Sequence, residues 1–220
     1  MNIKSLNKTL ALVVTIIISS MMAGCQSAYY SAMEKVGVHK RDILVDRVEE
    51  ARDAHANTQQ EFQTAYERLV KLTSFEGGEL EKVYNQLNND FEDSEAAAKD
   101  VAKKVDSVED VAQDLFEEWE TELDQYSNPK LRRSSEQKLK ETQRRFKQLL
   151  RSMRRAEAKM APILATLKDN VLYLKHNLNA SAVAAIKGEF ESLKSDISRL
   201  ITDMNKAIKE SDEFISALKN

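Results

Sequence analysis

Residues 98–119 read AKDVAKKVDSVEDVAQDLFEEW, and the fold is decided by this stretch. Its apolar residues return at alternating steps of three and four. That spacing places them on one side of an α-helix, in the heptad pattern by which long helices pack together. The pattern continues in both directions, from Leu80 to Tyr126, with polar residues only at Ser94 and Glu122. The stretch therefore predicts one long amphipathic helix.

Three other parts of the chain carry the same heptad pattern, from Leu44 to Leu72, from Leu139 to Asn177 and from Val183 to Leu218. Residues that end or cap helices separate the four seams. These breaks are Gly77-Gly78, Ser127-Asn128-Pro129 and Asn179-Ala180-Ser181. We expect helices at about 41–76, 79–126, 129–178 and 181–218. Pro162 lies inside the third helix and should kink it by removing one backbone hydrogen bond.

The connections between these helices are short, so consecutive helices must run antiparallel. The third and fourth seams carry a second apolar row, which is too wide for a two-stranded coiled coil and suits a bundle. Only two prolines and five glycines occur in 220 residues, and 31% of residues are charged, as expected for long helices. We predict an all-α, elongated, antiparallel four-helix bundle with coiled-coil-like packing over residues 41–220. Heptads do not distinguish a monomeric bundle from a dimer that shares helices.

The N-terminus has the pattern of a secretory signal. Lys4 and Lys8 precede the apolar run LALVVTIII at residues 10–18, which is shorter than the about 20 apolar residues of a membrane span. Ala23-Gly24-Cys25 then resembles a lipobox, the site at which bacterial lipoproteins are acylated and cleaved. We expect a lipoprotein signal peptide at 1–24, lipid attachment such as palmitate at Cys25, and a juxtamembrane segment at 25–40. An uncleaved signal anchor and a fully periplasmic product are the alternatives.

The lone cysteine supports the lipid reading, because an unpaired thiol in an oxidising compartment needs a cap. Gln26 follows it where an aspartate usually signals inner-membrane retention, so the expected address is the periplasmic face of the outer membrane. In an antiparallel bundle, the start of the first helix, the turn at 126–129 and the C-terminus share one end. Cys25 would tie that end to the membrane.

Charge differs sharply between the second and third helices. Residues 106–126 hold nine carboxylates and no basic residue, while residues 130–159 hold twelve basic residues and three acidic ones. Intramolecular pairing is one interpretation, with Lys138, Arg145 and Lys159 flanking the seam between the helices. The other is contact with anionic lipid headgroups at the membrane-proximal turn. The candidate headgroup contacts are Lys130, Arg132 and Arg133.

Residues 29–48 read YYSAMEKVGVHKRDILVDRV. This block resembles the opening of a family of uncharacterised Gram-negative bacterial lipoproteins, known only as a domain of unknown function. The similarity extends through the helical remainder. The resemblance implies an envelope location and a helical fold, and it implies no chemistry.

Motifs for catalysis are missing from the sequence. Gly77-Gly78 is followed by Glu79-Leu80, so it does not form a phosphate-binding loop. None of the three histidines has the spacing of a di-iron or zinc site, and His55 falls on a seam as a core residue. We therefore expect no enzyme activity, no metal or cofactor, and no nucleic-acid binding. The first hypothesis is a spacer or scaffold that binds an unidentified envelope protein, and the second is a direct binder of anionic lipid or cell-wall polymer.

Overall fold

The computed structural model describes residues 39–73, 80–177, 179–186 and 190–219. Within these ranges every regular element is a helix. Residues Leu44–Asn220 form one compact unit. The helices are α2 (Lys40–Thr73), α3 (Leu80–Leu123), α4 (Pro129–His176), α5 (Ala180–Ile186) and α6 (Phe190–Lys219).

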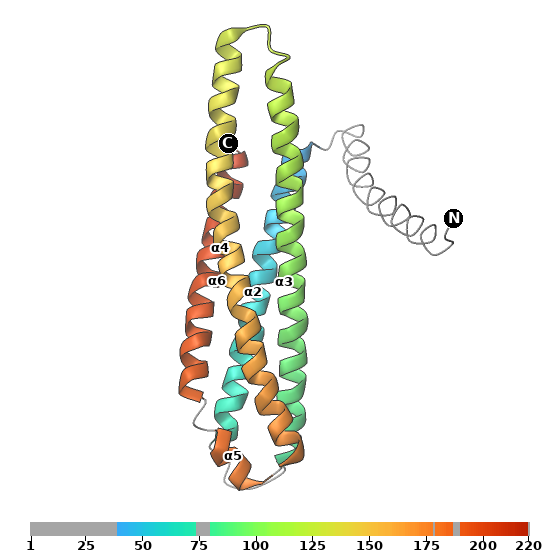
Figure 1. Ribbon diagram of the computed structural model, residues 1–220, viewed down its shortest axis with the longest axis vertical. Coiled ribbons are helices and arrows are strands. Elements are labelled where there is room, and N and C mark those ends of the chain that lie inside the picture. The colour runs from blue at the N-terminus through green and yellow to red at the C-terminus, as the bar shows by residue number, and fades with distance from the viewer. Residues whose placement is uncertain (1–38, 74–79, 178, 187–189, 220) are drawn as a thin grey trace, which may run out of the picture. The chain divides into compact units, whose positions relative to one another are not determined.

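The four long helices lie side by side and alternate in direction along the chain (Figure 1). α4 packs against α3 and against α6. α2 completes the ring, because Thr58 Oγ1 donates to the Ala97 carbonyl of α3 at 3.3 Å and Arg52 pairs with Asp212 of α6 at 3.0 Å. The predicted all-α, antiparallel four-helix bundle is confirmed.

The core consists of the predicted heptad positions. On α2 every seam position from Leu44 to Leu69 is buried, and on α6 the same holds from Leu193 to Leu218. Burying one leucine or phenylalanine side chain contributes roughly 1.5–3 kcal/mol relative to leaving it exposed. These stripes, more than helix propensity, hold the helices together.

Two buried serines on the seams make their hydrogen bonds inside their own helices. Ser94 Oγ donates to the Asp90 carbonyl at 2.7 Å, and Ser211 Oγ donates to the Ala207 carbonyl at 2.8 Å. A hydroxyl that donates to a carbonyl one turn earlier needs no partner across the core. Such residues therefore fit the apolar interior without breaking the heptad pattern.

The α3–α4 hairpin continues past the end of α6, as Figure 1 shows. The ring of Phe146 on α4 lies 5.9 Å from the ring of Phe214 on α6, measured between centroids. Because these helices are antiparallel, the end of α6, five residues further on, lies near residue 141 of α4. We call residues 115–140 the hairpin end, and the part where four helices pack together the four-helix section. The 126–129 turn and the end of α6 point to the same end of the bundle, as expected, but the turn lies beyond it.

The helix boundaries differ from the expected ones by a few residues. α3 ends at Leu123, three residues before the expected end, and α4 ends at His176. The expected end of the first helix at 74–76 lies outside the described residues. The C-terminal part holds two helices, α5 and α6, on either side of residues 187–189, which also lie outside the description. α4 runs through Pro162, and its axis changes direction below the middle of the helix in Figure 1.

Candidate functional site

The predicted site residues fall in two different parts of the chain. Cys25, the predicted lipid-attachment residue, lies outside the described residues, as do the predicted signal peptide and most of the juxtamembrane segment. Lys130, Arg132 and Arg133 lie in the first turn of α4 and are exposed. The hairpin end is therefore the part of the predicted site that lies within the described residues.

Asn128 begins α4. Its side-chain oxygen accepts hydrogen bonds from the backbone N–H groups of Lys130 at 2.9 Å and Leu131 at 3.3 Å. Pro129 follows at the first helical position, where its missing N–H costs nothing. Asn128 is therefore the N-cap and Pro129 the first helical residue, as the sequence predicted.

Two of the three basic residues of this turn are held by the hairpin itself. Arg132 donates to the Leu123 carbonyl at 3.1 Å and to the Asp124 carboxylate at 2.9 Å, which joins the end of α3 to the start of α4. Arg133 Nε donates to the Pro129 carbonyl at 3.2 Å. Arg132 therefore holds the turn in place. Of the three basic side chains, that of Lys130 is the least constrained by the hairpin.

Apolar side chains also reach solvent at this turn. Leu131 is 55% exposed and Tyr126 is 42% exposed. Just inside the hairpin, Leu123 and Leu139 are buried, and Trp119 Nε1 donates to Ser135 Oγ at 2.8 Å. The hairpin end thus has a small core of its own and an apolar tip flanked by positive charge.

Pairing between the acidic α3 and the basic α4 differs from the expected set. Arg154 makes the pairs, to Asp106 at 2.7 Å and to Glu109 at 2.6 Å. Of the residues expected to do so, Arg145 pairs with Glu141 on its own helix and Lys159 pairs with Asp203 of α6. Lys138 is exposed and makes no ion pair with a described residue. Of the three expected residues, only Lys159 makes an interhelical pair, and it pairs with α6 because the wide apolar stripe of α4 faces α6 as well as α3.

Arg154 is held by three carboxylates at once. Partial burial lowers its pKa, but hydrogen bonds to Glu109, Asp106 and Glu157 outweigh that effect, and the pKa is raised overall. The guanidinium stays charged in any case. Its role is to fix the relative position of α3 and α4.

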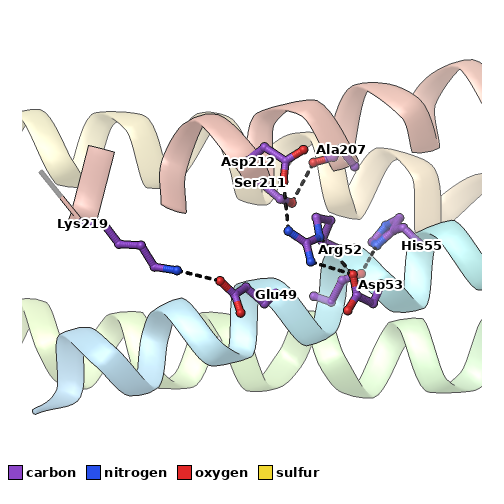
Figure 2. Close-up of polar contacts among 9 residues, drawn as sticks. Glu49, Arg52, Asp53, His55, Ala207, Ser211, Asp212 and Lys219 are labelled. Carbon is purple, nitrogen blue, oxygen red and sulfur yellow. Dashed lines mark hydrogen bonds and ion pairs between the residues drawn. The ribbon is translucent and has the colours of Figure 1, made fainter. Parts of the chain in front are cut away.

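Polar contacts also join α2 to α6, as Figure 2 shows. Arg52 bonds to Asp53 on its own helix and to Asp212 of α6, and Lys219 pairs with Glu49 at 2.9 Å. The pKa of Arg52 is raised, chiefly by its hydrogen bonds to Asp53 and Asp212. These pairs lie at the surface, so each contributes about 0.2–1 kcal/mol.

His55 lies three residues after Arg52 on α2 and is fully buried. Its Nδ1 lies 2.8 Å from the Ala51 carbonyl, and because a carbonyl only accepts, Nδ1 carries the proton. Nε2 is buried without a hydrogen-bond partner among the described residues. Burial lowers the pKa of His55, against weaker opposing effects of the Ala51 and Met153 backbone and the Glu157 charge. Its position in the core agrees with the sequence prediction.

The sequence missed two buried acidic side chains next to the seams. Glu210 of α6 accepts from Ser152 Oγ at 2.6 Å and from Gln148 Nε2 at 3.3 Å, both on α4. Asp90 of α3 pairs with Arg68 of α2. Each acidic residue flanks a seam position, which was visible in the sequence, but its partner on another helix was not.

The cavities on the described part of the surface are small or wide open to solvent. One, of about 60 Å³, lies beside Glu210 and Phe214. Another, of about 420 Å³, is lined by residues of α6 alone, so it lies along one side of a helix. In the described ranges, no group of three or more His, Cys, Asp or Glu side chains is placed to hold a metal ion. None of the described helices is both long and apolar enough to cross a membrane.

Comparison with known proteins identifies a family. No curated protein matches the chain. The family model described as "Protein of unknown function (DUF2959)" matches residues 29–218, beginning at the first residue of the YYSAMEKVGVHKRDILVDRV block. The predicted resemblance to a family without known function is thereby confirmed. Since the match covers most of the 220 residues, the chain belongs to the DUF2959 family of proteins of unknown function.

Proposed function

We propose that the protein is a lipid-anchored, non-enzymatic component of the cell envelope that acts as a spacer or protein-interaction scaffold. Cys25 carries the lipid, and the periplasmic face of the outer membrane is the proposed location. The N-terminal pattern of a basic segment, an apolar run and Ala-Gly-Cys supports this anchor. Two or more acyl chains on one residue hold a protein firmly at a membrane.

The observation that carries the scaffold proposal is the tip of the hairpin end. Tyr126 and Leu131 are exposed there, on a turn that the Asn128 cap and the Arg132–Asp124 pair hold in place. A preformed apolar tip loses little conformational entropy on binding. Tyrosine is also enriched among the residues that dominate binding energy at protein interfaces. The tip therefore suits a groove on another envelope protein.

A second function is supported by the charges around the same tip. Lys130, Arg132 and Arg133 flank the exposed apolar residues, and basic residues beside an interfacial aromatic also suit an anionic lipid surface. Each basic residue near such a surface contributes about 1 kcal/mol. In this alternative the tip contacts headgroups directly, without a protein partner.

The anchor is tested by Cys25→Ser. The variant should lose the acyl mass and leave the membrane fraction. An unchanged membrane fraction and an unchanged mass would contradict the lipid attachment.

The tip is tested with a photo-crosslinking residue at position 131 in growing cells. Position 172, where Leu172 is 46% exposed on the same helix, is the matched control. A single protein adduct from 131 and none from 172 supports the scaffold, and a lipid adduct supports the alternative. Equal yields from both positions would contradict both functions.

A further inference from the structure

Two stripes of opposite charge run along the α3–α4 hairpin. The acidic stripe consists of Asp106, Asp110, Glu117 and Glu120 on α3 and of Asp124 directly after it. The basic stripe lies on α4 and consists of Lys140, Lys147, Arg151 and Arg154. Their members are separated by three, four or seven residues, so each set shares one side of its helix. All are exposed except Arg154, whose side chain is 35% exposed.

Both stripes lie on the same side of the α3–α4 hairpin and cover the same length of it. Arg154 reaches Asp106 at 2.7 Å at one end, and Gln143, between two members of the basic stripe, reaches Glu120 at 3.0 Å near the other. Since the buried seam positions of α3 point to the opposite side, the two stripes together form one solvent-facing surface. We call it the striped face.

Contacts within the chain neutralise Asp106, which pairs with Arg154, and Asp124, which pairs with Arg132, and leave part of the remaining charge unneutralised. Arg154 is matched by carboxylates, and Lys140 pairs with Glu136. Lys147 and Arg151 make no hydrogen bond or ion pair with another residue of the described part of the chain. Glu117 accepts a hydrogen bond from the neutral Gln113 amide at 3.0 Å. Both stripes therefore keep charge for an external partner.

A uniformly charged partner fits this surface poorly. Neighbouring helix axes lie about 8–10 Å apart, which is close to the screening length of about 8 Å at physiological ionic strength. A membrane or a nucleic acid attracted by the basic stripe would be repelled by the acidic stripe beside it. The fitting partner carries both signs in the same arrangement, and a second copy of this chain does so.

We infer that the striped face is a docking surface for a second copy of the chain, with the acidic stripe of each copy facing the basic stripe of the other. A two-fold axis parallel to the helices produces this pairing. No shift along the axis is needed, because the stripes cover the same length. A two-fold axis across the helices would instead set like charges together. The pair would place both hairpin tips at the same end.

This inference goes beyond the proposed scaffold function. It uses neither Cys25 nor the tip residues Tyr126 and Leu131, so it stands if the anchor or the tip proposal fails.

The test is co-purification of two differently tagged copies of the full-length chain. The unmodified copies should co-purify at about 50 mM salt and lose about tenfold of that association at about 500 mM, because salt screens exposed charges. Lys147→Glu with Arg151→Glu should reduce association about tenfold, since acidic residues then face acidic ones. Glu117→Lys with Glu120→Lys should do the same.

Mixing the two variants decides the arrangement. Each variant repels itself, because the first carries acidic residues in both stripes and the second carries basic residues in both. In the mixed pair, every acidic stripe faces a basic one. Association should return to within about twofold of the unmodified pair. Lys82→Glu with Lys194→Glu makes the same change of charge at exposed residues outside the stripes and should leave association unchanged. Circular dichroism checks that every variant keeps its helices.

Several results would overturn the inference. They are no co-purification of the unmodified chain, an equal loss in the Lys82/Lys194 control, and failure of the mixed variants to associate. A different set of results would assign the basic stripe to a lipid surface instead. In that case the copies would not associate, and vesicles with anionic headgroups would bind the unmodified chain but not the Lys147/Arg151 variant.

Discussion

The same helix, α3, passes through two very different environments. In the four-helix section its seam residues Val101, Val105, Val108 and Ala112 are fully buried. In the hairpin end the heptad continues without a shift, yet Trp119 is half-buried and Glu122 is exposed, as is Tyr126 just past the end of α3. Periodicity therefore shows which side of a helix is apolar, and the number of neighbouring helices decides how deeply that side is buried.

The largest expected effect on stability comes from removing a large side chain from the core of the four-helix section. Phe62 is fully buried on α2, and Phe62→Ala should lower the free energy of unfolding by about 3–5 kcal/mol through lost burial and a cavity. Urea unfolding followed by circular dichroism measures the loss. A cost below about 1 kcal/mol would mean that the four-helix section is no more tightly packed than the hairpin end.

The buried histidine gives the four-helix section a pH dependence of its own. Burial holds the pKa of His55 below its ordinary 6.5, so the unfolded chain takes up the proton first as pH falls. His55 therefore imposes no penalty above pH 6.5, and stability falls below it, with a slope of at most about 1.4 kcal/mol per pH unit.

The check is urea unfolding of the unmodified chain and of His55→Leu between about pH 6.5 and pH 5, the range just below the ordinary histidine pKa. His55→Leu should remove most of the slope, because leucine takes up no proton. His176 is exposed, so His176→Gln should keep the slope of the unmodified chain. If His55→Leu keeps it too, another group carries the pH dependence.

Arg154 joins α3 to α4 inside the four-helix section, and its loss should weaken the packing of α3 against α4. Arg154→Met keeps the apolar stem and removes the contacts to Asp106, Glu109 and Glu157. We expect a loss of about 1–2 kcal/mol that shrinks at high salt, as for a network of exposed ion pairs. Arg151→Met is the matched control, and a loss as large in that variant would argue against a special role for Arg154.

Much of the four-helix section was predictable, because its helices and their apolar sides follow from residues close together in the sequence. Residues such as Leu44 and Phe62 are buried because the heptad pattern fixes the apolar side of a helix, and Asn128-Pro129 fixes where α4 begins. Arg154 and Glu210 were not identified, because their roles depend on how helices far apart in sequence are aligned. A helical pattern determines which positions flank a seam without determining which charges meet across it.

The expected site was predictable only in part. Lys130, Arg132 and Arg133 do lie at the exposed turn, but the sequence did not show that Arg132 would bond back to Leu123 and Asp124. It also did not show that the turn extends past α6, because that depends on the relative alignment of α4 and α6. Cys25, outside the described residues, stays a prediction.

A weaker cap should loosen the hairpin end and leave the four-helix section intact. Asn128→Ala removes the acceptor of the Lys130 and Leu131 N–H groups and should cost about 1 kcal/mol. Hydrogen exchange should accelerate about fivefold in the first turns of α4 and stay unchanged in α2 and α6. Asn128→Asp keeps an acceptor and should exchange like the unmodified chain. Faster exchange throughout the molecule would show that the two regions unfold together.

The smallest effect on stability is expected where the hairpin end is most exposed. Leu131 is 55% exposed, so Leu131→Ala should change the free energy of unfolding by less than about 0.5 kcal/mol. Leu139→Ala, two turns further along α4 at a buried position, should cost about 2 kcal/mol or more in the same urea experiment. A large cost at Leu131 would mean that the tip is covered within the folded protein and is not available to a partner. A negligible cost, together with loss of the crosslinked partner, would show that Leu131 serves binding. A residue that adds little to folding would then contribute chiefly when another molecule covers it.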